Sequence, residues 1–237
     1  MTETEDYSKA AIPKTHHATH EDGGGDEIGV EDLSGELADE QKSEFSKVSG
    51  LLAIFQGVVA GNWKTRLTSG AKNWTSVCWS PDLGLFVAVA YAGTDNLVMT
   101  SPNGINWTSR ATPADNNWFG VCWSPELSLF VAVAISGNAD RVMTSPNGIN
   151  WTIQTSATGN DWTAVCWSPE LSLFVAVARS GTGNRIMTSP NGIDWTTRIS
   201  PADNSWYSVC WSPELNLFVS VSITGTNNRV MTSLFYT

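Results

Sequence analysis

The chain has 237 residues, 41% of them hydrophobic, which allows one or two domains with a buried core. Its formal net charge is −10, yet residues 1–60 carry 13 of the 23 acidic and 4 of the 13 basic residues, so the remainder is nearly neutral. This distribution lacks the clustered Lys and Arg that neutralise phosphates, which argues against nucleic-acid binding and against docking on an anionic membrane. No apolar run is long enough to insert into a membrane as a helix, and the acidic N-terminus is unlike a secretory signal peptide.

The N-terminal segment, residues 1–59, is predicted to be extended and largely irregular. Within it, THHATHEDGGGDEIGVEDLSGELADEQ (15–41) resembles a low-complexity element of bacteriophage tail and head fibre proteins. The matching residues are His17, Ala18, His20, Gly23 to Asp26, Ile28, Leu33, Ser34, Gly35, Leu37, Ala38 and Asp39. By this resemblance, the chain is a virion appendage whose N-terminal segment contacts other virion proteins and forms a homotrimer. A disordered acidic linker is the alternative interpretation.

Two short features of this segment suggest further roles. His16, His17 and His20 could bind a metal if three chains came together, but three His without a pattern of acidic or Cys residues around them are more often a polar tether, and no metal site is assigned. The uncharged stretch LLAIFQGVV (51–59) is expected to pack against a neighbouring subunit or to cap the following domain.

From residue 60 onward the chain is repetitive, with a period of 44 residues set by Cys78, Cys122, Cys166 and Cys210. The copies read WTSVCWSPDLGLFVAVAYAGTDNLVMTSPNGINWTSR (74–110), then 118–154 and 162–198, and a fourth copy that begins at residue 206 and ends early. A period of about 40–50 residues built of short strands is typical of a propeller blade. We therefore predict an all-β fold, a four-bladed β-propeller of four-stranded repeats over residues 60–237.

Each copy predicts four strands. In the first copy, SVCWS leads into a Ser-Pro-Asp-Leu turn, and LFVAVA is apolar on both faces, as expected of a strand covered on both sides. LVMTS then enters a tight Ser-Pro-Asn-Gly hairpin, and INWTSR alternates like a half-exposed outer strand.

The outer-strand Trp recurs at 63, 107, 151 and 195, so one outer strand precedes the first blade and the last blade lacks one. We expect the strand around Trp63 to complete the last blade and to close a ring of four. The alternative is an open stack of sheets, whose exposed edges would favour aggregation.

The four Cys are interpreted as one apolar packing position copied four times. A metal bound by four thiols is the alternative, although the Cys-x-x-Cys spacing of zinc sites is missing. No cofactor is expected.

The hairpins SPNGINW (101–107 and 145–151) and SPNGIDW (189–195) resemble the Asp-box of sialidase-like propellers, with Asn103, Asn147 and Asn191 in place of the Asp. In that family the box is a folding element on the blade rim, so the resemblance concerns the fold. Sialidase chemistry would need an Arg cluster, a Tyr nucleophile and acid/base carboxylates. Here Asp82, Glu126, Glu170 and Glu214 recur at equivalent turns about a blade apart, so we predict no enzymatic activity.

Variation between the copies is concentrated in two loops on one face of the predicted ring, rich in Asn, Asp, Thr and Ser and adjacent to a recurring Trp. Amides beside an aromatic ring suit a sugar, which needs hydrogen bonds to hydroxyls and a flat surface for its C–H face. Packing between blades is the alternative role for these Trp. The predicted ligand-binding residues are Trp74, Trp118, Trp162, Trp206, Asn73, Asn117, Asp161, Asp95, Asp140 and Asn184.

Two functions follow from these expectations. The first is a virion fibre or appendage protein whose propeller binds a host-surface glycan. The second is a purely structural virion decoration or spacer without a ligand.

Overall fold

The computed structural model describes residues 63–233, and Lys64 begins a unit that continues to the C-terminus. All regular structure in this part of the chain is β-strand. The predictions made for residues 1–59, including trimerisation, the three histidines and the apolar stretch, lie outside the described residues.

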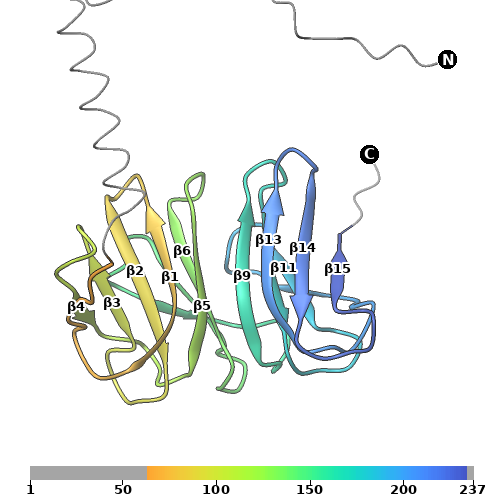
Figure 1. The fold of residues 1–237 in the computed structure, drawn as a ribbon, viewed down its shortest axis with the longest axis horizontal. Helices are drawn as coiled ribbons and strands as arrows, with labels where there is room; N and C mark the ends of the chain where they lie inside the picture. Colours follow the sequence, from red (N-terminus) through yellow and green to blue (C-terminus); the bar gives the residue numbers. More distant parts are fainter. Residues whose placement is uncertain (1–62, 234–237) are drawn as a thin grey trace, which may run out of the picture. The chain divides into compact units, whose positions relative to one another are not determined.

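Four antiparallel sheets, each made of consecutive strands, build this unit (Figure 1). Sheet 1 contains β1 (Asn73–Ser80), β2 (Leu85–Tyr91), β3 (Val98–Ser101) and β4 (Thr108–Arg110). Sheet 2 contains β5 (Trp118–Ser124), β6 (Leu129–Ala134), β7 (Val142–Ser145) and β8 (Thr152–Gln154). Sheet 3 contains β9 (Trp162–Ser168), β10 (Leu173–Ala178), β11 (Ile186–Ser189) and β12 (Thr196–Arg198). Sheet 4 contains β13 (Trp206–Ser212), β14 (Leu217–Ser222) and β15 (Val230–Thr232). The predicted all-β fold of repeated four-stranded units is confirmed, except that three strands are described in sheet 4.

Side chains define the turns as the sequence suggested. In the first hairpin, the Ser101 hydroxyl accepts hydrogen bonds from the backbone N–H groups of Asn103 and Gly104. The amide oxygen of Asn103 accepts two more, from Ile105 and Asn106. Gly104 has a φ of +69°, which few residues other than glycine adopt without strain. The same bonds recur in the hairpins of sheets 2 and 3, so a fixed sequence gives a fixed turn.

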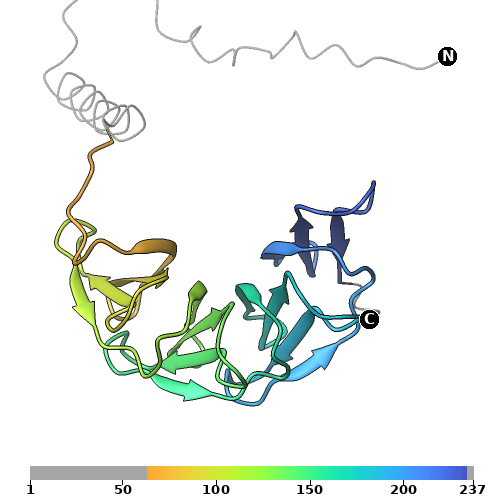
Figure 2. The same cartoon turned by 90° about the horizontal axis from the view of Figure 1, so that it is seen from below.

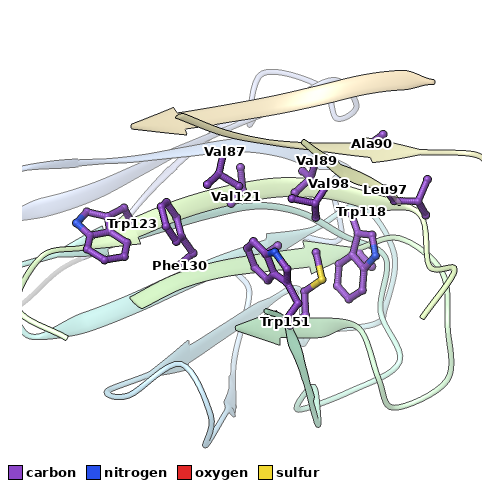
Figure 3. Close-up of a cluster of buried hydrophobic side chains, with 13 residues drawn as sticks. Val87, Val89, Ala90, Leu97, Val98, Trp118, Val121, Trp123, Phe130 and Trp151 are labelled. Atoms are coloured by element: carbon purple, nitrogen blue, oxygen red, sulfur yellow. The ribbon is translucent and has the colours of Figure 1, made fainter. Parts of the chain in front are cut away.

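Neighbouring sheets stack face to face in chain order (Figure 2). One face of each sheet is formed mainly by valines, which in sheet 1 are Val87, Val89 and Val98; we call it the valine face. It packs against the tryptophan face of the next sheet, which in sheet 2 includes Trp123 and Phe130 (Figure 3). Burying both faces of the β2-type strand explains why LFVAVA carries no polar residue.

The array does not close within the described part of the chain. The four sheets follow an open arc, with β1 against β5, β5 against β9 and β9 against β13, whereas β1 and β13 form no such interface (Figure 2). Trp63 is fully exposed, residues 63–68 form no strand, and nothing pairs with the free edge of β15 in the described residues. The structure therefore does not show the expected closure by the strand around Trp63.

Candidate ligand-binding site

The variable loops do lie along one edge of the array. In each antiparallel sheet, the first strand begins and the second strand ends at the same edge, as β1 and β2 do through the pairs Asn73 with Tyr91 and Trp74 with Ala90. The loop after the second strand and the connection that enters the next sheet therefore meet at this edge, which we call the loop face. The Ser-Pro-Asn-Gly hairpins lie at the opposite edge, because Phe86 at the start of β2 pairs with Ser101 at the end of β3.

The recurring Trp of the loop face has a packing role. Trp118, Trp162 and Trp206 are 0% exposed, so none offers a ring face to a ligand. Each indole N–H donates to a backbone carbonyl four residues earlier, on Ala114, Thr158 and Ala202 respectively. Trp74 is half-buried, and its indole nitrogen is buried without a hydrogen-bond partner. These rings fill the core between sheets, which was the alternative role considered for them.

Three of the six predicted polar site residues stabilise the loops themselves. The Asn117 side chain accepts a hydrogen bond from the N–H of Ala92, which links sheet 2 to the loop of sheet 1. Asp140 accepts from the N–H of Asn138 within its own loop, and Asn184 accepts from the buried amide of Asn160. These side-chain oxygens already accept hydrogen bonds within the protein, from the backbone at Asn117 and Asp140 and from a side chain at Asn184, which limits their use in ligand recognition. Asn73 and Asp95 remain exposed at the edge of sheet 1.

Asp161 forms the centre of an ionic cluster. Its carboxylate accepts from Arg141 Nη1 at 2.7 Å and from Arg179 Nε at 3.2 Å. Arg141 comes from the loop of sheet 2, whereas Asp161 and Arg179 belong to sheet 3. The Tyr207 phenol and the Asp161 carboxylate raise the pKa of Arg179. The three charged groups carry a net charge of +1, and the Arg179 side chain is 36% exposed, so this cluster can present a cation to a ligand.

A row of aromatic rings adjoins this cluster. The ring centroids of Tyr91 and Phe119 lie 6.1 Å apart, and those of Phe119 and Tyr207 lie 6.2 Å apart. The row spans sheets 1, 2 and 4, and Tyr207 links it to Arg179. Tyr91 is exposed, and the other two rings are half-buried. We call Tyr91, Phe119, Tyr207, Arg179 and Asp161 the inner aromatic site.

Sheet 3 contributes no aromatic ring to this row, because a threonine occupies the relevant position. The position of Phe119 and Tyr207 is occupied by Thr75 in sheet 1 and by Thr163 in sheet 3. The Thr163 hydroxyl lies 2.6 Å from the carbonyl oxygen of Trp206, and the Thr75 hydroxyl lies 3.1 Å from that of Trp118. A threonine at this position therefore links its sheet to the next one, whereas an aromatic residue is directed to the site.

Sequence reasoning missed four of the five residues of the inner aromatic site. The signal that could have found them is variation at two positions, one directly after the recurring Trp and one directly after the apolar run of the second strand. Tyr91 and Arg179 begin variable loops in which the Asp and Asn residues were predicted as ligand contacts instead. The position after the recurring Trp reads Thr75, Phe119, Thr163 and Tyr207, and the position that follows the apolar run of the second strand reads Tyr91, Ile135, Arg179 and Ile223. Only Asp161 was included among the predicted site residues.

The recurring acidic turn residues have a structural task. A carboxylate oxygen of Asp82 accepts from the indole N–H of Trp123 in the next sheet at 3.2 Å. Glu126 does the same with Trp167, and Glu170 with Trp211, both at 2.6 Å. Each carboxylate therefore joins its sheet to the following one.

Cys78, Cys122 and Cys166 lie between sheets, whereas Cys210 is exposed. Burial raises the pKa of Cys78 to about 12 and that of Cys166 to about 11, and it raises that of Cys122 as well. A metal ligand must be a thiolate, which this setting disfavours. Over residues 63–233, no group of three or more His, Cys, Asp or Glu side chains is placed to bind a metal ion. Within the same residues, no helix could cross a membrane.

Comparison with known proteins supports the fold but does not identify a function. No protein-family model matches the sequence, and a search of curated proteins gave no match. Solved structures with propeller-like folds are similar to this chain. One, described as a nidogen/laminin complex, has a TM-score of 0.51 at 10% identity and covers 64% of this chain and 57% of that chain. This chain thus spans little more than half the length of that protein.

Two further structures have lower scores. Catalytically inactive H270A virginiamycin B lyase from Staphylococcus aureus, with quinupristin, has a TM-score of 0.48 at 9% identity and covers 74% of each chain. A structural genomics protein of unknown function from Bacteroides thetaiotaomicron VPI-5482 has a TM-score of 0.49 at 11% identity and covers 68% of this chain and 42% of that one. At such identities the likeness concerns the fold alone.

Proposed function

We propose that this chain is a receptor-binding appendage protein of a virion, and that its repeat array binds a carbohydrate at the inner aromatic site. The observation that supports this proposal is the row of Tyr91, Phe119 and Tyr207 beside the partly exposed guanidinium of Arg179. Aromatic rings suit the C–H face of a sugar, and the Tyr hydroxyls, Arg179 and Asp161 can hydrogen-bond its hydroxyl groups. The net positive charge of the cluster favours an acidic sugar over a neutral one.

Binding without catalysis is part of the proposal. Asp161 is engaged by two arginines, and Asp82, Glu126 and Glu170 accept hydrogen bonds from indole groups. A carboxylate in such contacts is a poor candidate for the acid/base pair that glycoside hydrolysis requires. The site therefore holds a ligand and leaves it unchanged.

The virion assignment rests on the sequence. Residues 15–41 resemble the attachment element of phage fibre proteins. In this proposal the N-terminal segment binds other virion proteins and trimerises. Three linked sites raise avidity over single-site affinity by about 10²–10⁴, provided that the receptor lets them engage together.

The experiment is glycan-array binding by the full chain, followed by titration with the best neutral and the best acidic saccharide. Tyr91→Ala and Tyr207→Ala should each weaken binding about three- to tenfold, because each removes a stacking surface worth about 1 kcal/mol. Ile149→Ala is the matched control, since Ile149 is similarly exposed but lies on a hairpin at the opposite edge. It should bind like the unaltered chain.

Attachment to host cells separates the two functions considered. Enzymatic removal of surface glycans should abolish attachment of the full chain. Equal attachment with and without glycans, together with an empty glycan array, would favour the structural decoration and overturn the carbohydrate proposal.

A further inference from the structure

Among residues 63–233, no sheet packs against the tryptophan face of sheet 1. Val77 is 58% exposed and Trp79 is 42% exposed, whereas the equivalent Val121 and Trp123 of sheet 2 are 6% and 8% exposed. The sequence at these positions is the same in both copies, so the face is built for burial and lacks its partner. Large apolar side chains exposed together in this way mark an interaction surface.

In the same part of the chain, no sheet packs against the valine face of sheet 4 either. Val221 is 47% exposed and Val230 is 61% exposed, but the equivalent Val133 and Val142 of sheet 2 are both fully buried. Cys210 on this face is also exposed, unlike the three other cysteines. The two ends of the array are therefore the two complementary halves of one interface, which the chain already forms three times between its own sheets.

The polar contacts between sheets point to the same pairing. At each of the three interfaces, a turn carboxylate accepts a hydrogen bond from an indole of the next sheet: Asp82 from Trp123, Glu126 from Trp167 and Glu170 from Trp211. The corresponding carboxylate of sheet 4 is Glu214, and the corresponding indole of sheet 1 is Trp79. Both are solvent-exposed.

A groove also borders sheet 4. A groove of about 530 Å³ lies between sheets 3 and 4, lined by Ile186, Arg198, Phe218 and Met231 among others. In sheets 2 and 3 the outer-strand residues Trp151 and Trp195 pack on Phe130 and Phe174, the counterparts of Phe218. The groove thus lies where the Trp of a fourth strand would pack.

Trp63 has the sequence position of that missing residue. Each outer-strand Trp precedes the buried Trp of the following sheet by 11 residues, as Trp107 precedes Trp118, and Trp63 precedes Trp74 by the same number. The segment from Trp63 to Arg66 is therefore spaced to form the outer strand of whichever sheet comes before sheet 1. Arg66 would then face Thr232, as Arg110 faces Thr100 and Arg198 faces Thr188.

We propose that two copies of this chain join head to tail, with the valine face of sheet 4 in each copy covering the tryptophan face of sheet 1 in the other, into a closed ring of eight sheets. The residues from Trp63 to Arg66 of each copy complete sheet 4 of its partner, and Glu214 of each copy accepts a hydrogen bond from the Trp79 indole of its partner. A head-to-tail interface closes into a ring only when the rotation between copies permits it. Each copy contributes four sheets, the open arc rules out closure at four, and eight is the next multiple within the usual range of propellers.

The first experiment is mass measurement of the full chain at micromolar concentration by sedimentation velocity and native mass spectrometry. The unaltered chain should have twice the mass of Val77→Asp and twice the mass of Val221→Asp if the N-terminal segment is monomeric. The ratio is the same if that segment forms the proposed trimer, because three arrays cannot all pair within one trimer and two trimers must join. Both positions are exposed, so the substitutions leave the cores between sheets intact, and far-UV circular dichroism checks this. Ile193→Asp, on an exposed hairpin residue away from both end faces, should leave the mass unchanged.

Mixing the two variants tests the head-to-tail arrangement. Val77→Asp retains an intact sheet 4 and Val221→Asp an intact sheet 1, so together they should form one good interface and a one-to-one complex. A complex absent from the mixture overturns the proposal, since a face-to-face dimer or closure within one chain would behave in that way. A wild-type mass that grows continuously with concentration would indicate an open filament and overturn the ring, and a threefold mass would overturn eight sheets.

Labelling of the Cys210 thiol gives an independent measurement. In the ring, Cys210 is covered, so its alkylation should be at least tenfold slower in the unaltered chain than in Val77→Asp. Trp63→Ala should weaken the association at least tenfold, because it empties the groove of sheet 4. Equal labelling rates in both proteins would contradict the proposed burial of this face.

Discussion

A buried asparagine holds each variable loop of the last three sheets. The side-chain amide nitrogen of Asn160 donates to the backbone carbonyl of Asn184 at 2.8 Å. Asn116 and Asn204 donate in the same way to the backbone carbonyls of Asp140 and Asn228, each 24 residues later in the chain. In sheet 1 the ammonium group of Lys72 takes this task by donating to the carbonyls of Thr94 and Asp95. These loops are polar because they must satisfy their own backbone, which explains why their Asn and Asp residues are poor guides to a ligand site.

Gly181 shows how closely this clamp fits. Its φ is +108°, and an added Cβ would clash with the side-chain amide of Asn160. Gly183 also has a positive φ, +68°, but an added Cβ would meet no atom within 4 Å. We expect Gly183→Ala to lower the free energy of unfolding by about 1–2 kcal/mol through backbone strain alone. Gly181→Ala should cost about 1–3 kcal/mol more, because it also displaces a buried hydrogen-bonding group.

Urea denaturation monitored by Trp fluorescence measures both values. Equal losses in the two variants would show that the Asn160 clamp does not constrain this loop.

Strands and turns could be predicted from the sequence to within a few residues. Apolar runs such as LFVAVA, and the Pro and Asn-Gly signals beside them, are local patterns that determine local structure, and the copies repeat them. The inner aromatic site could not be predicted in this way, because Tyr91, Phe119 and Tyr207 come from three different sheets. Their proximity depends on the angle between neighbouring sheets, and a repeat pattern in the sequence does not give this angle. The same reason explains why ring closure was expected whereas the array forms an open arc.

Thr163 links two elements and allows a test of the interface between sheets 3 and 4. Its hydroxyl is buried and lies 2.6 Å from the Trp206 carbonyl oxygen of the next sheet. Thr163→Val keeps the shape of the side chain but removes the donor, so we expect it to lower the free energy of unfolding by about 1–2 kcal/mol. Thr196→Val is the control, because Thr196 is exposed on β12 and should change stability by less than about 0.5 kcal/mol. Calorimetry of both variants gives the comparison; indistinguishable unfolding temperatures would mean that this hydroxyl does not contribute to sheet stacking.

For the whole molecule, the thiols between the sheets link stability to pH. Folding raises the pKa of Cys78 to about 12 and that of Cys166 to about 11, from the ordinary value of 9.0. The folded chain therefore favours the neutral thiol, and this contribution to stability is complete below about pH 9 and is lost as the pH rises toward 11–12. We expect the urea midpoint to fall across this range.

Replacement of Cys78 and Cys166 by Ala gives the control, because the fall should then become smaller. Mass spectrometry after iodoacetamide treatment at pH 8 should find Cys78, Cys122 and Cys166 unmodified in the folded chain and all four thiols modified in urea. Rapid modification of Cys122 without denaturant would contradict the buried setting of these residues.

The near-identity of the three internal interfaces has a consequence for how the chain reaches its native state. Each valine face resembles the others, so a collapsing polypeptide can pack together sheets that are 88 residues apart in sequence, opposed only by a modest extra entropy of loop closure. Such misassembly is characteristic of repeat proteins, and chain connectivity is the main feature that favours the native order over a scrambled one. During synthesis the repeats emerge from the ribosome one at a time, so each new sheet has a single uncovered valine face to pack against. Folding during synthesis should therefore avoid the misassembled states that can form when the whole chain is refolded from denaturant.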